Sequence, residues 1–328
     1  MRQPRCSLSE SKGEMTITTT QVSPATLSRP DPVARALLLI NRNARGGQVN
    51  VAPMLDRLYE AGFDLVEDWV INPSDVSNLI RKYRDKVDMV IIGGGDGTIS
   101  QAADGLVETG LSLGILPLGT ANDLARTLKL PDDPLAAVEV IVQGHQKRID
   151  LGWVNGTHFF NVASMGLTTA VTQRMSRQGK SRWGMLAYLF AAIQVIVRAR
   201  PFGVEISNGQ ETIRVRSVQV SVGNGRHYGC GLTIDEHAQI DDGLLNLYSL
   251  EILRWWQIIP LLPALRRGTL ANSKNARTMR GTQFEVRPLS RRAKTIMADG
   301  EASGLSPAQF RIVPKALSVF VPAVSSPD

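Results

Sequence analysis

The stretch VDMVIIGGGDGT, residues 87–98, constrains the fold of this chain more than any other. Five of its first six residues are apolar, which is typical of a strand buried on both faces of a parallel sheet. Three glycines, Asp96, Gly97 and Thr98 follow without a spacer. Because glycine allows sharp turns and close backbone approach to a ligand, the stretch predicts a buried strand, a glycine turn and a helix.

Strand and helix patterns alternate on both sides of this stretch. Apolar runs predict further strands at 36–41, 63–70 and 111–119, and helical spacing predicts helices at 50–61, 73–86, 99–110 and 120–130. Ser74 is a candidate cap for the second of these helices. Since strands that alternate with helices form parallel sheets covered on both faces, residues 35–150 are expected to form an α/β domain.

After Asp150 the pattern changes to short β segments. Asn155-Gly156 and Asn208-Gly209 each separate two such segments, and these dipeptides favour hairpin turns. Residues 151–310 are therefore predicted to form a mainly antiparallel β domain. Residues 1–34 are rich in Ser and Thr and contain no apolar run, which predicts a disordered tail without a secretory signal.

Composition limits the partners and the compartment. A net charge of +7 suits anionic partners such as nucleotides, nucleic acid or an acidic membrane surface. Two cysteines imply no disulfide framework, so a reducing, cytoplasmic location is expected. The longest apolar stretch, residues 183–197, is shorter than the roughly 20 residues of a membrane span and favours a buried or cleft-lining helix.

Two neighbouring turns predict a site for nucleotide phosphates. The first combines glycines, Asp96 and a helix N-terminus, whose N–H groups and partial positive charge favour an anion. The second, LPLGTANDLAR, places Thr120, Asn122 and Asp123 at the start of the next helix. Either turn alone could be an ordinary strand–helix connection with a capping carboxylate, but two adjacent strand ends favour one continuous site. The G-x-x-x-x-G-K pattern of P-loop proteins is absent.

Together, GGGDGT and LPLGTANDLAR resemble the diacylglycerol kinase catalytic domain in its bacterial YegS-like lipid kinase form. Three later segments agree: RIDLGWVNG, SVGNGRHYGCGLTIDEHAQIDDGLLNL and MADGE. The resemblance implies an NAD-kinase/diacylglycerol-kinase-like α/β domain at 35–150 that binds ATP, and a β-sandwich lipid-binding domain at 151–310. It also implies that a last strand near 311–328 returns to the first domain.

The resemblance implies a role for each matching residue. ATP is expected on the first turn (Asn41, Arg42, Asn43, Ala44, Arg45), on the glycine turn (Gly95, Asp96, Gly97, Thr98, Ile99, Ser100, Gln101) and on Thr120 and Asn122. A Mg²⁺ site is expected at Gln239, Asp242 and the carbonyl of Leu244, with Asp123 and Asp150 in the same hydrated metal network. Glu301 matches the proton acceptor, with Asp299 beside it and Asp96 as the competing base.

Two departures from the family pattern stand out. The first turn reads NRNARGG where relatives often have Asn-Pro, and WVINPSD lacks a threonine that the family often carries at the end of the second strand. The expected activity is an ATP- and Mg²⁺-dependent transfer of the γ-phosphate to a lipid hydroxyl. An NAD kinase and a catalytically inactive nucleotide- or lipid-binding regulator are the alternatives. The lipid and the oligomeric state, with a homodimer among the options, stay open.

The sequence gives weaker indications of which segments would contact lipid. Residues 181–202 and 253–268 place aromatic and apolar residues beside arginines, as at a membrane interface, although core helices with solvated ends explain them equally well. Peripheral attachment to the inner face of the membrane is the resulting hypothesis. The charge run of Arg291, Arg292 and Lys294 is interpreted as a solvated loop, and His158 as an ordinary polar residue.

Overall fold

The parallel strands form the centre of the N-terminal half. In the computed structural model, the order of these strands is β2-β1-β3-β4. The residues that the structure describes are 33–41, 50–70, 72–167, 169, 197, 199–228, 232–233, 237–252, 254, 256–257, 261–270 and 273–323. The bounds are β1 Ala34–Asn41, β2 Phe63–Val70, β3 Met89–Gly94 and β4 Ser112–Pro117. All three adjacent pairs are parallel, as the alternating pattern predicts.

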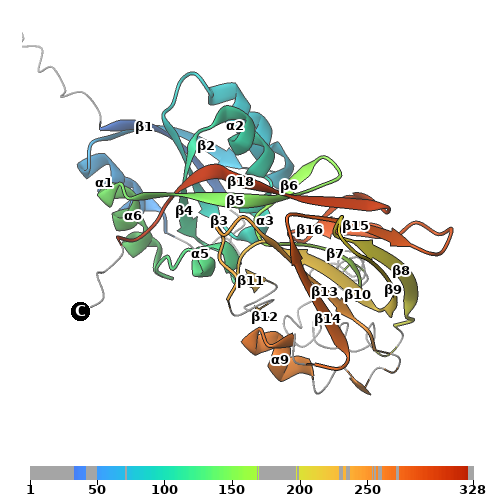
Figure 1. Cartoon of the computed structure of the whole chain (residues 1–328). Helices are drawn as coiled ribbons and strands as arrows, with labels where there is room; N and C mark the ends of the chain where they lie inside the picture. Colours follow the sequence, from blue (N-terminus) through green and yellow to red (C-terminus); the bar gives the residue numbers. More distant parts are fainter. Residues whose placement is uncertain are drawn as a thin grey trace, which may run out of the picture. The chain divides into compact units, whose positions relative to one another are not determined.

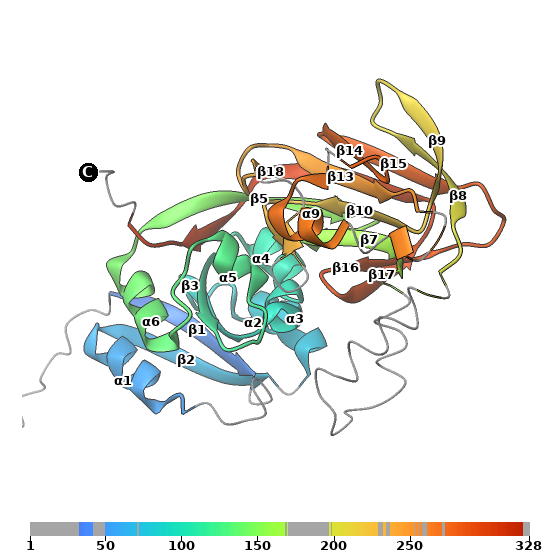
Figure 2. The same ribbon diagram turned by 90° about the horizontal axis from the view of Figure 1, so that it is seen from below.

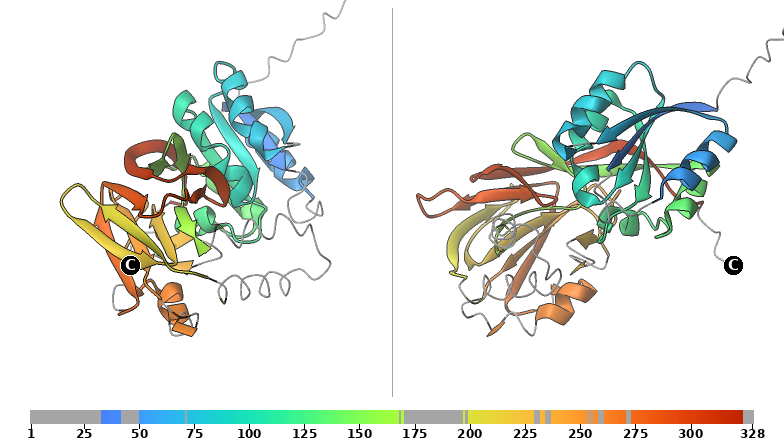
Figure 3. Two further views of the ribbon diagram at one scale, coloured as in Figure 1. Left: turned by 90° about the vertical axis from the view of Figure 1, so that its right-hand side faces the viewer. Right: turned by 180° about the vertical axis from the view of Figure 1, so that it is seen from behind.

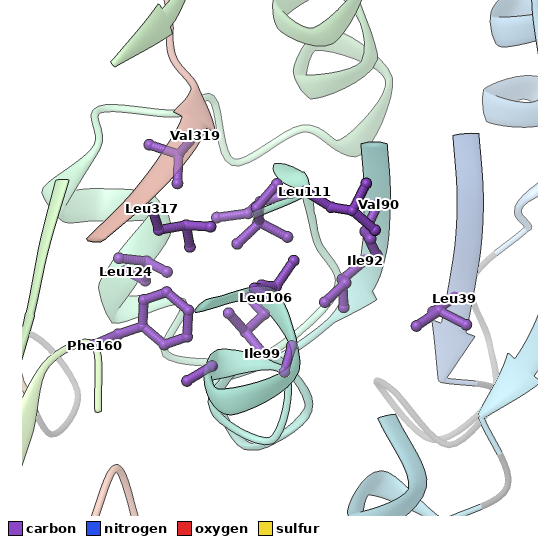
Figure 4. Close-up of a cluster of buried hydrophobic side chains, with 14 of the residues drawn as sticks. Leu39, Val90, Ile92, Ile99, Leu106, Leu111, Leu124, Phe160, Leu317 and Val319 are labelled. Carbon is purple, nitrogen blue, oxygen red and sulfur yellow. The ribbon is translucent and has the colours of Figure 1, made fainter. Parts of the chain in front are cut away.

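Helices cover both faces of these strands (Figure 3). One face is covered by α1 (Ala52–Glu60) and α6 (Pro134–Gln143). The other carries the short 3-10 helix η2 (Pro73–Asp75), α2 (Val76–Tyr83), α3 (Asp96–Ser100), α4 (Ala103–Thr109) and α5 (Asp123–Thr127). Figure 4 shows apolar side chains from α3, α4 and α5 gathered with Phe160 and Leu317 in the core on this second face.

The helix predicted at 99–110 is in fact two helices. Ser77 of α2 lies at the break, where its Oγ donates to the carbonyl of Gln101 at 2.6 Å and accepts from the N–H of Gly105 at 3.0 Å. A Cβ on Gly105 would lie only 2.8 Å from the Cα of Ser77, so α2 and α4 approach closely. The predicted cap at Ser74 is wrong, because α2 begins at Val76 without a side-chain cap.

The C-terminal half is built from antiparallel strands. A six-stranded sheet has the order β14-β13-β10-β7-β16-β17, and strands β15, β8 and β9 extend the first sheet (Figures 1 and 2). The bounds are β7 Val162–Gly166, β8 Phe202–Ser207, β9 Thr212–Ser217, β10 Gln219–Gly223, β13 Leu245–Leu250, β14 Ala276–Gly281, β15 Gln283–Pro288, β16 Thr295–Ala298 and β17 Glu301–Leu305. The smaller elements are β11 His227–Tyr228, β12 Leu232–Thr233 and α9 Leu262–Arg267.

Both hairpins predicted from Asn-Gly are present. Strands β5 (Gln146–Val154) and β6 (Thr157–Phe159) pair across Asn155-Gly156, and β8 pairs with β9 across Asn208-Gly209. Asn155 and Gly156 have φ values of +46° and +104°, the left-handed backbone that a tight hairpin turn requires. The first hairpin carries His158 to the edge of the candidate site described below.

The last strand, β18 (Ala308–Phe320), belongs to both halves. Its first residues pair with β15, Val319 near its end pairs in parallel with β4, and β5 pairs with it from Phe310 to Phe320. A bulge between Val313 and Leu317 separates the two regions, and Lys315 within it has a φ of +52°. Residues 32–328 consequently form one compact unit. Among the described residues, no helix combines the length and the apolar character that crossing a bilayer requires.

Candidate active site

The two glycine turns lie in direct contact. Strands β3 and β4 are neighbours, and the N–H of Leu118 donates to the carbonyl of Gly94 at 3.0 Å. A Cβ on Gly119 would lie 2.4 Å from the Cα of Gly95, and a Cβ on Gly95 would lie 2.9 Å from the Cα of Gly119. Since these distances are shorter than any normal Cβ contact, both positions need glycine for the turns to meet.

Asn122 shapes the second turn from within. Its backbone is left-handed, with a φ of +51°, and its side chain is buried. The Oδ1 atom accepts from the N–H of Gly119 at 3.0 Å, and Nδ2 donates to the carbonyl of the same residue at 3.2 Å. Its amide therefore closes the turn, whereas Thr120, the neighbouring predicted ATP ligand, is exposed.

Asp96 connects the first turn to the helix that follows the second. It is the first residue of α3, yet its Oδ1 accepts from the N–H of Leu124 in α5 at 3.4 Å. Burial, and next the charge of Asp123, raise the pKa of Asp96, while backbone N–H groups of residues 122–124 act in the opposite direction. Two carboxylates are thus held close together at the N-terminus of α5.

The side chains of two predicted ATP ligands face the protein. Thr98 is buried and its Oγ1 accepts from Nδ2 of Asn41 at 2.8 Å, which ties the end of β1 to α3. Ile99 is buried in the core, so only its backbone is available to a ligand. Ser100 and Gln101 line a cavity described below. The predicted ligands at 42–45 lie outside the described residues.

Asp299 occupies the turn between β16 and β17. Its φ of +46° is left-handed, and its carboxylate accepts three backbone N–H bonds, from Phe160 at 2.7 Å, Asn161 at 3.0 Å and Val162 at 2.9 Å. Burial raises the pKa of Asp299 to about 6 against these three bonds, and the charge of Asp96 contributes to the rise. The β16–β17 turn and the glycine turn are therefore close enough for the carboxylates of Asp299 and Asp96 to interact.

Glu301, two residues further on, lines a cavity of about 310 Å³. Elements from both halves form its walls, and the described lining residues are Ser74, Ser77, Asn78, Arg81, Ser100, Gln101, Asp104, Thr157, His158, Ala298, Glu301, Ala302 and Ser303. The exposed carboxylate of Glu301 thus shares a cavity with Ser100 and Gln101, at the end of α3. Because these side chains are mainly polar, the cavity suits a polar reacting group.

An aspartate–histidine pair in this cavity joins the two halves. Oδ1 of Asp104 in α4 lies 2.7 Å from Nδ1 of His158 in β6 and accepts from the backbone N–H of the same histidine at 3.0 Å. These contacts with His158 lower the pKa of Asp104 in spite of its burial. The sequence interpretation of His158 as an ordinary polar residue missed this contact, since its partner is 54 residues away.

The predicted metal ligands have partners within the protein. Asp242 accepts from the N–H of Leu244 at 2.9 Å and of Gln239 at 3.2 Å, and pairs with Arg280 at 3.1 Å. Asp150 is buried, and its two oxygens accept from the N–H groups of Lys315 in the β18 bulge and of Gly243, each at 2.7 Å. Asp150 therefore fixes the point where β18 passes between the halves.

Oxygen donors of this kind suit Mg²⁺ in their chemistry. Arg280 pairs with Oδ2 of Asp242, so a metal ion on this carboxylate would share it with the guanidinium. Within the described ranges, no three His, Cys, Asp or Glu side chains are grouped as a metal site would need.

Comparison with known proteins identifies the family to which this fold and these turns belong. Residues 35–154 match the family model described as the diacylglycerol kinase catalytic domain, and residues 161–321 match the YegS C-terminal NAD kinase beta sandwich-like domain. The chain is 33% identical to a diacylglycerol kinase of Mycobacterium tuberculosis over 276 residues, which cover 81% of this chain and 87% of that protein.

Two further relatives agree with this assignment. The chain is 34% identical to a Klebsiella pneumoniae protein named as a YegS-like lipid kinase, over 72% of this chain and 78% of the relative. A crystal structure of a Bacillus anthracis protein described as a diacylglycerol kinase superposes with a TM-score of 0.75 at 25% identity, covering 88% of this chain and 97% of that one. The chain belongs to the diacylglycerol kinase family.

Proposed function

We propose that this protein transfers the γ-phosphate of ATP to the hydroxyl group of a diacylglycerol-like lipid, with Mg²⁺ as the cofactor. The observation that carries this function is the contact between the two glycine turns at Gly95 and Gly119. It brings two helix N-termini and the carboxylate of Asp96 to one edge of the sheet. A triphosphate and its metal ion need such an arrangement, because phosphoryl transfer depends mainly on positioning and charge neutralisation.

In this proposal the phosphates lie on residues 95–101 and Thr120, beside the first turn at Asn41. The bound Mg²⁺ would neutralise phosphate charge. Asp242, Gln239 and the carbonyl of Leu244 would hold a structural ion, with Asp123 and Asp150 in the same hydrated metal network.

The acceptor hydroxyl would enter the cavity that Glu301 lines. A carboxylate within hydrogen-bond reach can take the hydroxyl proton late in the transfer, and Glu301 is exposed there. Asp299 would support it from the same turn. Its carboxylate is already engaged by three backbone N–H groups, which favours a positioning role over that of the base.

A labelling assay tests this function. The purified protein is incubated with γ-labelled ATP and MgCl₂, together with mixed micelles of diacylglycerol, phosphatidylglycerol or a sphingoid base, or with NAD. Label in the organic phase is the expected result and identifies the lipid. Label on NAD would instead favour an NAD kinase, and label on no acceptor would favour an inactive regulator.

A further inference from the structure

The loop after β15 and the end of β17 form one continuous surface, which we name the Arg291 patch: Leu289, Arg291, Arg292, Lys294 and Leu305. The side chain of Leu289 lies over Gly203, and the ammonium group of Lys294 lies 4.5 Å from the ring centre of the adjacent Phe202. Lys294 also exchanges hydrogen bonds with Ser306, the residue after Leu305. These contacts make the loop and the strand end neighbours (strands labelled in Figure 2).

Two apolar side chains in this patch face solvent. Leu289 is 56% exposed and Leu305 is 59% exposed, which are high values for leucine in a folded domain. Arg291 and Arg292 are exposed beside them. A surface that combines exposed apolar side chains with cations is a candidate for an interaction site.

The cations of the patch differ from their neighbours on the sheet. Arginines of nearby strands are paired with carboxylates, as in Arg214–Glu205, Arg277–Glu251, Arg280–Asp242 and Arg287–Glu285. Arg291 and Arg292 form no ion pair with any residue that the structure describes. The sequence contains no acidic residue at 288–298 or at 302–327, so no carboxylate from these segments neutralises the patch. These charges are therefore available to an external anion.

We infer that the Arg291 patch docks the protein on an anionic lipid bilayer, an inference that rests on the proposed lipid acceptor. Cations attracted to lipid phosphates and leucines inserted at the acyl boundary are the two components of interfacial binding. Leu305 lies on the β16–β17 hairpin that also carries Glu301, and the other residues of the patch lie on the loop that leads into this hairpin. Leu305 is four residues along β17 from Glu301, about 13 Å at the usual rise of a strand. Docking there would hold the candidate base close above the headgroup layer, where a lipid hydroxyl lies.

Vesicle sedimentation tests whether the charges of Arg291 and Arg292 contribute to membrane binding. The full-length protein is mixed with vesicles of phosphatidylglycerol and phosphatidylcholine at low salt, and with vesicles of phosphatidylcholine alone. The double variant R291A/R292A is expected to bind the anionic vesicles roughly 30-fold less tightly, at about fivefold per cation. R84A/K86A is the matched control, because it removes two exposed cations from the other half of the protein and should change binding by about threefold or less. Equal losses in both variants, or equal binding to both kinds of vesicle, would refute the patch.

A second pair of variants tests whether a leucine of the patch inserts into the bilayer. L305S should weaken binding to anionic vesicles severalfold, whereas L135S, at an exposed leucine of α6, should leave it unchanged. Equal effects would show that Leu305 does not insert. Far-UV circular dichroism checks that each variant is folded, which is expected because Leu305 is 59% and Leu135 is 42% exposed.

Activity assays separate this inference from the proposed function. R291A/R292A should phosphorylate a water-soluble short-chain diacylglycerol as fast as the unmodified protein, and lose activity only on acceptors embedded in anionic vesicles. A loss on both acceptors would contradict a docking role. If the unmodified protein phosphorylates no lipid but still binds vesicles through the patch, the proposed function fails while the docking surface stands.

Discussion

Asp299 provides the sharpest quantitative test of the site. The pKa of its carboxyl is about 6 in the folded protein, against an ordinary value of 3.8, chiefly because of burial. Between these two values the folded state retains a proton that the unfolded state has lost. Stability from this group is therefore fully present below about pH 4 and is lost as the pH rises through 6. The gap corresponds to about 3 kcal/mol.

The substitution Asp299→Asn removes this titration. Asn tolerates the left-handed backbone and can still accept from Asn161 and Val162, but its Nδ2 would oppose the N–H of Phe160. A pH-independent loss of about 1–3 kcal/mol is expected from that unsatisfied donor. The unmodified protein, in contrast, should become less stable as the pH rises. Its unfolding free energy should fall by about 3 kcal/mol relative to that of D299N between pH 4 and pH 7.

Urea unfolding at half-unit pH steps measures both quantities. The difference in unfolding free energy between the two proteins should narrow or change sign as the pH rises. Asp56→Asn, at an exposed aspartate of α1, controls for the loss of one carboxylate. A difference between the unmodified protein and D299N that stays constant from pH 4 to pH 7 would show that the carboxylate of Asp299 is not desolvated, and the reasoning would be wrong.

Three further predictions concern the two turns, the aspartate–histidine pair and the base. Gly119→Ala should lower the unfolding free energy by about 1–3 kcal/mol and weaken ATP binding, because the added Cβ would meet the Cα of Gly95. Gly97→Ala is the control: its added Cβ would meet no atom within 4 Å, so this variant should not be destabilised in thermal melts. Asp104→Asn should lose about 1–2 kcal/mol in urea unfolding and lower kcat/KM for the lipid without changing ATP affinity. Glu301→Gln should reduce kcat roughly 100- to 10,000-fold with ATP affinity retained in calorimetry; a kcat within threefold of the unmodified protein would exclude it as the base.

The sequence predicts the parallel sheet well because its signal is local. Six residues such as VDMVII are enough to indicate a strand buried on both faces, and the two residues Asn-Gly are enough to indicate a hairpin turn. Contact between the turns at Gly95 and Gly119 also follows, since consecutive strands that pair in parallel end at the same edge of the sheet. These features need no information from distant parts of the chain.

Other features depend on contacts that no local pattern encodes. Asp96 is an ordinary candidate for capping its own helix, yet its carboxylate accepts from the N–H of Leu124 in another helix. The side-chain amide of Asn122, a predicted ATP ligand, closes its own turn through both atoms of its amide. The contact between Asp104 and His158 spans 54 residues, and the bulge of β18 at Lys315 becomes meaningful only once Asp150 is seen to accept its N–H.

The β5–β6 hairpin links α4 to the β16–β17 turn through these contacts. Asp104 of α4 holds His158 on this hairpin, and the N–H groups of residues 160–162, just beyond it, hold the carboxylate of Asp299. Two short sets of hydrogen bonds therefore connect α4, whose neighbour α3 begins at the glycine turn, to the β16–β17 turn. Phosphoryl transfer depends on the placement of two reacting groups within a fraction of an ångström. In the proposed function, this link would therefore fix the distance between the bound nucleotide and Glu301.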